Sequence, residues 1–368
     1  MIRADLKRID AAISELAREI DFYPLLTPVN RLEEQEKFFL NLAREKEYNP
    51  RFIYKKKDFT GEKDTLRRMR DSLREEDLLE GIFRRKIDFM LTEQELLDCG
   101  DWSFGEVAKK LHGTPEEGCI EKAAAILENS LQSDYAFPEE SVTPEEMAGE
   151  LSEYMRGKGL EWKVRITDKI IPKITVSGKD RTLYINSRIR YTRAEVQRLK
   201  VHEIEVHVYR GANGAVQPYR IFTEGLAGYN ETEEGLAVMM EDVSGCLEVD
   251  TRQMKLYAGR SLSTHLCMRG SFYEAYRGLE RYFPGYMAYR LVERAKRGIS
   301  DTSLKGCLTK GSHYISGWIK LRKYVEQHKD LSIIYVGKVR MEDAGSLEEL
   351  LRENLLKPAQ YFPDFRCG

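Results

Sequence analysis

The residues that could carry chemistry are two histidines five positions apart, in the segment His202-Glu-Ile-Glu-Val-His207. A glutamate directly after the first histidine is also found on zinc-peptidase helices, whose histidines are four positions apart (HExxH) and nearly eclipse. On a regular α-helix, a separation of five positions would turn the two side chains roughly 140° apart. The spacing therefore predicts a widened, π-type turn between His202 and His207, because an inserted π-turn absorbs one extra residue.

A third ligand can come from the helix expected next, which contains the run Glu-Glu-Gly-Leu-Ala at 233–237. Two histidines and one carboxylate, with water in the fourth position, form a catalytic rather than a structural zinc arrangement. If Asn230 caps this helix and Glu233 closes a capping box, Glu234 is left to face inward. Glu234 is thus the first candidate, Glu233 the second and Glu224 the third. Glu241, seven residues after Glu234 on the same helix face, could orient a ligand.

The metal-binding helix should begin at a capping box formed by Thr192 and Glu195 and end at Gly211. Before it, β-rich runs at 162–167, 169–176 and 182–186 predict a small antiparallel sheet. A last strand is expected at 333–339. The predicted fold class is α+β: predominantly helical, with the small antiparallel sheet next to a metal-binding HExxxH helix, in a gluzincin-like arrangement.

Two regions are expected along the 368 residues. Apolar residues at helical spacing make residues 1–135 a mainly helical N-terminal region. A Ser-, Pro- and Glu-rich loop separates it from residues 136–368, expected to form the catalytic domain. The strand at 182–186 could offer an edge on which an extended peptide docks.

Composition limits the partners. The net charge is only −2, with 33% charged residues, which argues against nucleic acid or a membrane surface as a partner. No apolar stretch is long enough to span a bilayer, and the N-terminus lacks the apolar core of a secretory signal. The six cysteines form no CxxC pair, so reduced thiols and a cytoplasmic location are expected.

Several of these residues resemble a known family. The HEIxxH and EEGLA segments are similar to those of the zinc peptidases related to microtubule-associated tyrosine carboxypeptidases, whose bacterial branch is recognised by a QEGLA motif. The segment YNPRFIY at 48–54 resembles an upstream NPxFxY element of that family. A C-terminal element, RG … GxxTKDxxYLxG, is matched by Arg297-Gly298, by Gly306 to Lys310, and by Tyr314 and Gly317.

The resemblance implies zinc held by His202, His207 and Glu234, with Glu203 as the catalytic base, and trimming of a peptide or protein C-terminus. Tyrosine release is known for the eukaryotic relatives. Two departures concern substrate choice more than activity. The family often has Gly-Thr before the second histidine where this chain has Glu-Val, and Gly311 replaces an acidic residue.

The expected mechanism uses a zinc-activated water, from which Glu203 takes a proton for later delivery to the leaving amine. Tyr314 is the first candidate for a second stabiliser of the oxyanion. A carboxypeptidase must also hold a free terminal carboxylate, which calls for a cation in the cleft. The candidates for that role are Lys310, Arg210 and Arg297.

Two other functions remain open. A metal-dependent aminopeptidase or endopeptidase would use the same ion, although an aminopeptidase needs an acidic rather than a cationic pocket. A non-catalytic regulator could keep zinc for structure alone, but such a site has no use for a base at Glu203. The oligomeric state and the physiological substrate are not predicted by the sequence.

Overall fold

The computed structural model describes residues 4–19, 22–130, 141–170, 172–249, 251–327 and 330–363. The chain folds into two compact units, each built from separate stretches of sequence. The first unit comprises Met1–Asp10, Ser133–Met254 and Gly317–Gly368, and the second comprises Ala11–Gln132 and Lys255–Ser316. Three helices run from one unit into the other, namely α1 (Ala4–Glu19), α14 (Thr251–Arg269) and α17 (His313–Glu326).

This division does not follow the expected boundary at 135/136, which itself lies outside the described residues. The segment Lys255–Ser316 belongs with the N-terminal helices rather than with the rest of residues 136–368. Compactness is not a test of function, so the assignment of residues 136–368 as the catalytic domain stays a prediction.

The described residues of the second unit form helices and connecting loops, with no strand longer than the isolated bridge between Arg51 and Asp301. Its helices, besides parts of α1, α14 and α17, are α2 (Phe22–Leu25), α3 (Arg31–Leu42), α4 (Thr60–Asp71), α5 (Leu78–Asp98), α6 (Asp101–His112), α7 (Glu117–Asn129), α15 (Phe272–Leu279), α16 (Gly285–Ala295) and the 3₁₀ turn η2 (Thr309–Ser312). One of its apolar clusters joins Leu26, Leu96, Phe104 and Leu111 to Ile299 and Leu308 from the C-terminal stretch. Burial of these side chains holds the two stretches of the unit together.

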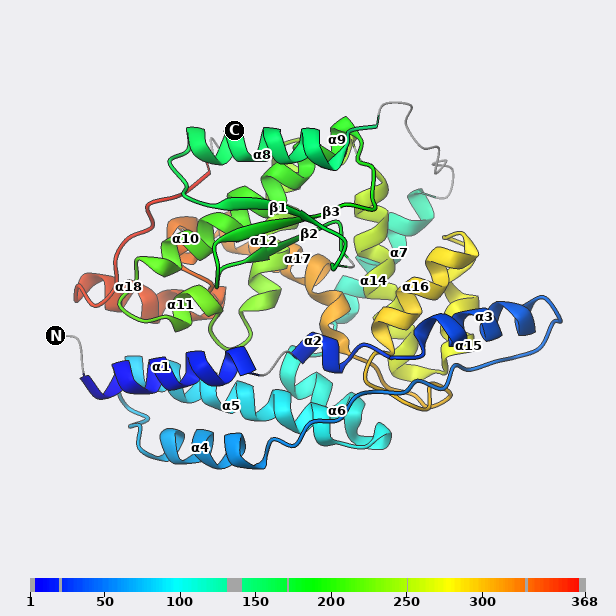
Figure 1. Cartoon of the computed structure of the whole chain (residues 1–368), viewed down its shortest axis with the longest axis horizontal. Helices are drawn as coiled ribbons and strands as arrows, with labels where there is room; N and C mark the ends of the chain where they lie inside the picture. The colour runs from blue at the N-terminus through cyan, green and yellow to red at the C-terminus, as the bar shows by residue number, and fades with distance from the viewer. Residues whose placement is uncertain are drawn as a thin grey trace. The chain divides into compact units, whose positions relative to one another are not determined.

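The first unit combines a small sheet with helices (Figure 1). Its strands are β1 (Lys163–Thr167), β2 (Ile174–Ser177) and β3 (Thr182–Asn186). Its helices are α8 (Pro144–Gly157), α9 (Arg193–Leu199), the π-helix η1 (Lys200–Val208), α10 (Tyr209–Ala215), α11 (Ile221–Glu224), α12 (Tyr229–Val243), α13 (Cys246–Val249), the 3₁₀ turns η3 (Leu331–Val336) and η4 (Met341–Asp343), and α18 (Ala344–Arg352). Helix α8 contacts β1 and β3, and η1 contacts β2, so the sheet lies between them.

The sheet is mixed, which corrects the antiparallel sheet expected from the sequence. Its order is β1-β3-β2, with β3 parallel to β1 and antiparallel to β2. The strand at 182–186 is therefore central, and both of its edges are already paired. It cannot serve as the docking edge predicted for it, because an added strand needs free backbone groups.

The strand expected at 333–339 is also wrong. Residues 333–336 belong to the 3₁₀ helix η3, which begins after Asp330, whose side chain accepts from the backbone NH of Ser332 at 2.8 Å. The guanidinium of Arg210 donates to the carbonyls that follow, at Ile334, Gly337 and Val339. Contacts from another element thus satisfy backbone groups that a strand would have paired within a sheet.

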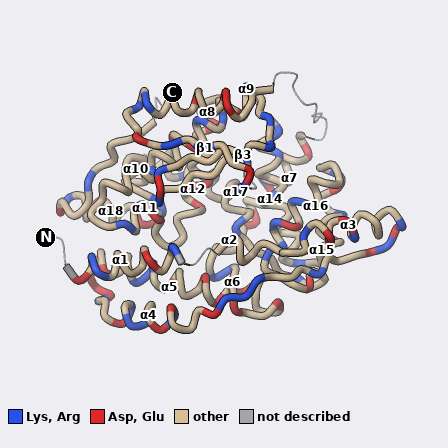
Figure 2. Tube along the Cα trace, in the orientation of Figure 1, with Lys and Arg blue, Asp and Glu red and all other residues tan. Residues whose placement is uncertain are grey.

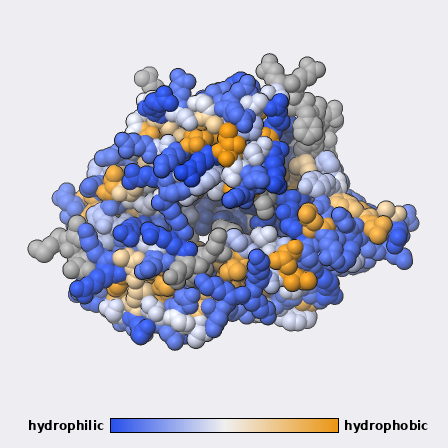
Figure 3. Space-filling view, viewed as in Figure 1, coloured by the Kyte–Doolittle hydropathy of each residue, from blue (hydrophilic) through white to orange (hydrophobic). Residues whose placement is uncertain are grey.

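Charged residues of both signs are interspersed along the chain (Figure 2), and their total is a net charge of −2. On the face shown in Figure 3, hydrophilic residues predominate and apolar ones form separate small patches. Among the residues that the structure describes, no helix combines the length and apolarity that crossing a bilayer requires.

Candidate metal centre

The two histidines lie on a π-helix, and the predicted widened turn is confirmed. Residues 200–208 form nine residues of π-helix between α9 and α10. In such a helix the backbone bonds from residue i to residue i+5, so residue 207 returns above residue 202. The rings of His202 and His207 meet edge to face, with their centroids 5.0 Å apart. Buried Ile204, Val206 and Val208 alternate with the more exposed side chains and fix this turn in the core.

The start of this helical run is as predicted, and its end is not. Thr192 accepts from the backbone NH of Glu195, and Glu195 accepts from that of Thr192, which completes the capping box. Gly211, expected to terminate the helix, lies inside α10, which continues to Ala215. A Cβ on Gly211 would lie 3.5 Å from the ring of Trp162, an ordinary contact, so neither a helix end nor crowding requires glycine at this position.

Glu234 completes a group of three possible ligands. His202, His207 and Glu234 each offer one possible ligand atom, and these three atoms lie within 4.8 Å of one another. Nε2 of His202 is 3.9 Å from Oε2 of Glu234. Around a tetrahedral zinc ion, ligand atoms about 2.1 Å from the metal would be about 3.4 Å apart. The His202–Glu234 pair would therefore have to close by about half an ångström, and the widest pair by at most about 1.4 Å, to seat an ion. The donor set and its spacing fit zinc.

The imidazole of His202 is held by Glu241, as its position on the helix predicted. Oε1 of Glu241 lies 2.8 Å from Nδ1 of His202 and accepts a 2.7 Å hydrogen bond from Arg198. Burial alone would raise the pKa of Glu241, but Arg198 and His202 outweigh it and keep the pKa below its ordinary value. A carboxylate at Nδ1 directs the lone pair of Nε2 toward a metal.

The imidazole of His207 has a similar partner that the sequence did not reveal. Oε1 of Glu233 lies 3.1 Å from Nδ1 of His207 and 3.5 Å from the ammonium of Lys338. Burial would raise the pKa of Glu233, but Lys338 and His207 hold it well below the usual range. Burial would likewise lower the pKa of His207, and the Glu233 carboxylate raises it instead. Glu233 is thus placed to orient His207.

The capping box predicted for α12 is wrong, which explains why the sequence did not reveal that Glu233 orients His207. Helix α12 begins at Tyr229 after Gly228, which has a left-handed φ of 68° and supplies no side-chain cap. Asn230 therefore lies inside the helix, and Glu233 is freed from the helix end. Both orienting carboxylates and the candidate third ligand, Glu234, come from α12, which packs against η1.

Two further glutamates can be placed. Glu203 is partly exposed on η1, directly after His202, and its charge contributes to the raised pKa of His207. Glu224, the third candidate ligand, lies at the end of α11 and is not part of the group of three found among the described residues. The centre is accessible, because the side chains of His202, His207 and Glu234 are 9%, 14% and 16% exposed.

Arg210 is fully buried rather than facing a cleft. Its guanidinium donates to three backbone carbonyls, the shortest contact being 2.6 Å to Val339, and its Nη1 lies 4.0 Å from Glu233. Burial lowers the pKa of this guanidinium. Its contacts hold η3 and the segment after it against α10, so in this structure Arg210 does not present its charge to a ligand.

The other predicted site residues belong to the second unit. Tyr314 is buried and stacks on Tyr257, with ring centroids 4.8 Å apart. Lys310 and Arg297 line one pocket of that unit, together with Arg260 and Arg294. The structure thus brings Lys310 and Arg297 together as neighbours.

Comparison with known proteins decides the family. The model of the family described as "Microtubule-associated tyrosine carboxypeptidase" matches residues 36–366. This chain belongs to the microtubule-associated tyrosine carboxypeptidase family. It is 33% identical over 151 residues to microtubule-associated tyrosine carboxypeptidase 1 of Homo sapiens, covering 40% of this chain and 31% of that protein. The protein of the same name from Rattus norvegicus is 32% identical over 152 residues, with the same coverage. The chain thus spans about a third of the length of these relatives.

Two sequence elements that resemble those of the carboxypeptidase family pair with each other in the second unit. The hydroxyl of Tyr54 accepts from the backbone NH of Gly298 at 3.0 Å, and Thr302 donates to the carbonyl of Pro50 at 2.7 Å. Gly298 has a φ of 92°, and a Cβ there would come 2.2 Å from the ring of Phe104. These contacts give the NPRFIY and Arg-Gly segments a structural role.

Proposed function

We propose that this chain is a zinc-dependent metallopeptidase, gluzincin-like in its site, that removes the C-terminal residue of a peptide or protein. The observation that carries the proposal is the convergence of His202, His207 and Glu234 within 4.8 Å. Two imidazoles and one carboxylate are the ligand set of catalytic zinc sites, which keep a position open for water. Relatives named tyrosine carboxypeptidases support the same chemistry, with tyrosine as the proposed residue released.

The chain's own residues divide the work. A zinc ion held by the three ligands would supply Lewis-acid polarisation of a peptide carbonyl and activation of water. Glu203 takes the proton from the attacking water and delivers it to the leaving amine. Glu241 and Glu233 hold Nδ1 of the two histidines, which fixes both rings and keeps each Nε2 unprotonated toward the ion. Tyr314 remains the proposed second stabiliser of the oxyanion, and Lys310 and Arg297 the proposed carboxylate-binding residues.

The decisive variant is Glu203→Gln, which keeps the side-chain shape and removes the base. Loss of a positioned base should lower turnover about 10²–10⁴-fold. Cleavage of peptides with varied C-terminal residues would be followed by mass spectrometry, and bound zinc by elemental analysis. The variant should keep one zinc per chain, because Glu203 is not a ligand. Glu248→Gln, an exposed carboxylate on α13, is the matched control and should cleave as the wild type does.

The product masses separate the alternatives. Loss of the C-terminal residue supports the carboxypeptidase, whereas loss of the N-terminal residue or internal cleavage indicates an aminopeptidase or an endopeptidase. Wild-type protein that carries stoichiometric zinc and cleaves no peptide would instead indicate a regulator. Unchanged turnover in Glu203→Gln would contradict the proposed role of that residue.

A further inference from the structure

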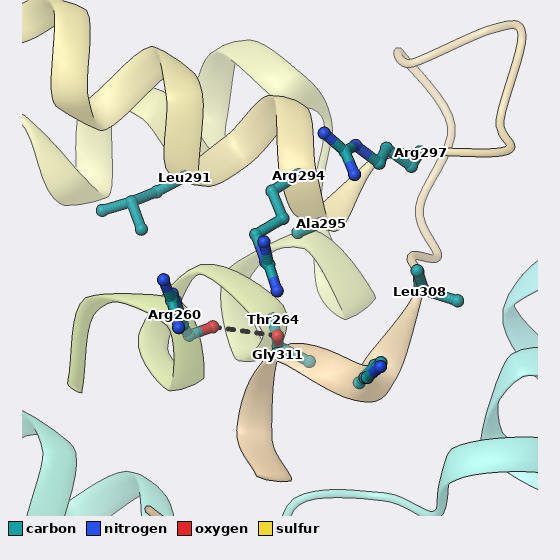
Figure 4. A pocket seen from close by; sticks show the side chains of 9 residues that line it. Arg260, Thr264, Leu291, Arg294, Ala295, Arg297, Leu308 and Gly311 are labelled. Carbon is teal, nitrogen blue, oxygen red and sulfur yellow. Dashed lines mark hydrogen bonds between the residues drawn. The ribbon is translucent and has the colours of Figure 1, made fainter. Parts of the chain in front are cut away.

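A small cationic pocket lies in the second unit, where α14, α16 and η2 meet (Figure 4). Its volume is about 30 Å³, and four of its lining residues are basic: Arg260, Arg294, Arg297 and Lys310. None of the described residues that line it is acidic. Figure 4 shows Arg294 extending toward Thr264, with Arg260 on the neighbouring helix and Arg297 beyond the end of α16. Four cations around one cavity repel one another unless an anion compensates them.

Two of these arginines have no carboxylate partner among the described residues. The guanidinium of Arg260 lies over the rings of Tyr314 and Tyr257, at 4.4 and 5.6 Å from their centroids. Nε of Arg297 is buried and lacks a hydrogen-bond acceptor. Burial, reinforced by the charge of Arg294, lowers the pKa of Arg297 to about 10. A buried donor without an acceptor is costly, so this donor favours an oxygen acceptor that enters the pocket, and the surrounding positive charge favours an anionic one.

Nearby carboxylates do not fill this role. Glu293 is the acidic residue whose charge favours the cationic form of Arg297. It already pairs with Arg31 at 3.0 Å and with Arg290 at 3.3 Å. Glu93 is the carboxyl next to Lys310, which opposes the burial-driven rise of the pKa of Glu93 to about 7.

Gly311 forms part of the pocket wall and keeps it open. A Cβ at this position would lie 2.5 Å from Oγ1 of Thr264 and 3.0 Å from the carbonyl oxygen of Arg260. In this chain the glycine contributes neither a side chain nor a negative charge, so the pocket keeps its cationic character.

We infer that this pocket binds a single oxyanion group of carboxylate size, with Arg260 and Arg297 as its principal donors. Guanidinium groups offer paired N–H donors that match the two oxygens of a carboxylate or of a phosphate. A cavity of about 30 Å³ has room for such a small head group, since about half that space already holds one water. If the oxyanion is the carboxylate of a peptide substrate, the inference rests on the proposed function and deepens it. Binding itself requires neither metal nor turnover.

The test measures binding in the absence of hydrolysis. Full-length protein stripped of metal by a chelator would be titrated in a calorimeter with three probes. They are inorganic phosphate, a peptide with a free C-terminal carboxylate, and the same peptide with an amidated C-terminus. We expect at least one carboxylate or phosphate probe to bind and the amidated peptide to bind more weakly. Arg297→Gln and Arg260→Gln should each weaken binding at least about 10-fold.

Two controls separate site chemistry from folding and from bulk charge. Arg67→Gln removes an equal charge from the exposed face of α4 in the same unit and should change affinity less than about 2-fold. Arg260→Lys keeps the charge and loses the planar fork, so it should fall between wild type and Arg260→Gln. Thermal unfolding would check that each variant is folded.

The outcomes are distinct. Binding of phosphate that competes with the free-carboxylate peptide assigns both oxyanions to this pocket, and binding of only one of them identifies the source. The inference is overturned if no oxyanion binds, or if Arg297→Gln and Arg260→Gln bind as the wild type does. Because the metal is absent throughout, a failure here is separate from loss of cleavage in Glu203→Gln.

Discussion

Gly235 and Gly317 lie back to back where α12 meets α17, and neither has room for a side chain. A Cβ on Gly235 would come 2.2 Å from the carbonyl carbon of Gly317, and one on Gly317 would come 2.2 Å from the carbonyl oxygen of Glu231. The glycine of the Glu-Glu-Gly-Leu-Ala run therefore acts in packing. It lets α17 support α12 directly behind the carboxylates that face the histidines.

The first prediction is that Gly235→Ala destabilises the fold. The added methyl meets backbone atoms, which cannot move aside as a side chain could, so we expect a loss of about 3 kcal/mol in the free energy of unfolding. Gly149 is an exposed position of α8, and a Cβ there would meet nothing within 4 Å. Gly149→Ala should therefore be neutral or slightly stabilising. Denaturant unfolding of both variants would measure this. Equal stability of the two would show that α12 and α17 can separate at no cost.

The second prediction concerns Glu241→Gln. The amide oxygen can still accept from His202, but the charge that holds the imidazole and pairs with buried Arg198 is lost. We expect zinc affinity to fall about 10–100-fold and stability to fall by about 3 kcal/mol, because Arg198 is left unpaired. Competition with a chromophoric chelator would give the affinity.

A neighbouring carboxylate provides the comparison for Glu241. Asp242 pairs with Trp318 and Arg322 at the surface of α12, so Asp242→Asn should leave zinc affinity within about 2-fold of the wild type. If both variants lost affinity equally, the effect would come from α12 as a whole and not from the hydrogen bond to His202.

The third prediction is a pH dependence that originates at Glu93. Burial raises the pKa of this carboxyl from 4.5 to about 7, although Lys86 and Lys310 oppose the shift. A raised folded-state pKa means that the protonated form stabilises the fold. This contribution is complete below pH 4.5 and is lost as pH rises through about 7. Glu93→Gln should therefore match the wild type near pH 4 and exceed its stability at pH 8 by about 1–3 kcal/mol.

Thermal unfolding at the two pH values would measure the Glu93 effect. Glu95→Gln removes an exposed carboxylate from the same helix, where it pairs with Lys110 at 3.1 Å, and should show no such pH-dependent gain. A Glu93→Gln variant that is less stable than the wild type at pH 8 would mean that the ionised carboxylate is favoured by its surroundings.

The ligands were predictable because short-range spacing decides where their side chains point. Five positions between His202 and His207 require a π-turn, and Glu241 follows Glu234 by two helical turns. Glu233 was not predictable, because its role depends on where α12 begins. The sequence offered Asn230 as a cap, whereas the helix starts at Tyr229 after Gly228, two residues earlier than such a cap implies. The contact of Lys338 with Glu233 was not predictable either, because Lys338 lies far from Glu233 in the sequence.

The fold shows the same limit. Alternating residues located β3 correctly at 182–186, but alternation does not say which strands become neighbours, so its central place in a mixed sheet was missed. The apolar run at 333–339 has strand-like composition, and buried contacts to Arg210 override it. The pocket residues Arg260 and Arg294 carry no motif, and only tertiary structure joins them to Lys310 and Arg297.

The placement of the third ligand and of both orienting carboxylates on α12 has a mechanical consequence. An ion held by His202, His207 and Glu234 would cross-link η1 to α12. The two segments are well separated in the sequence, because Glu234 follows His207 by 27 positions. Because Glu233 and Glu241 lie on the same helix as Glu234, any shift of α12 relative to η1 would move Glu234 and the two carboxylates that orient His202 and His207 at the same time. Such a centre would be assembled or lost as a whole, with few partly ligated states between.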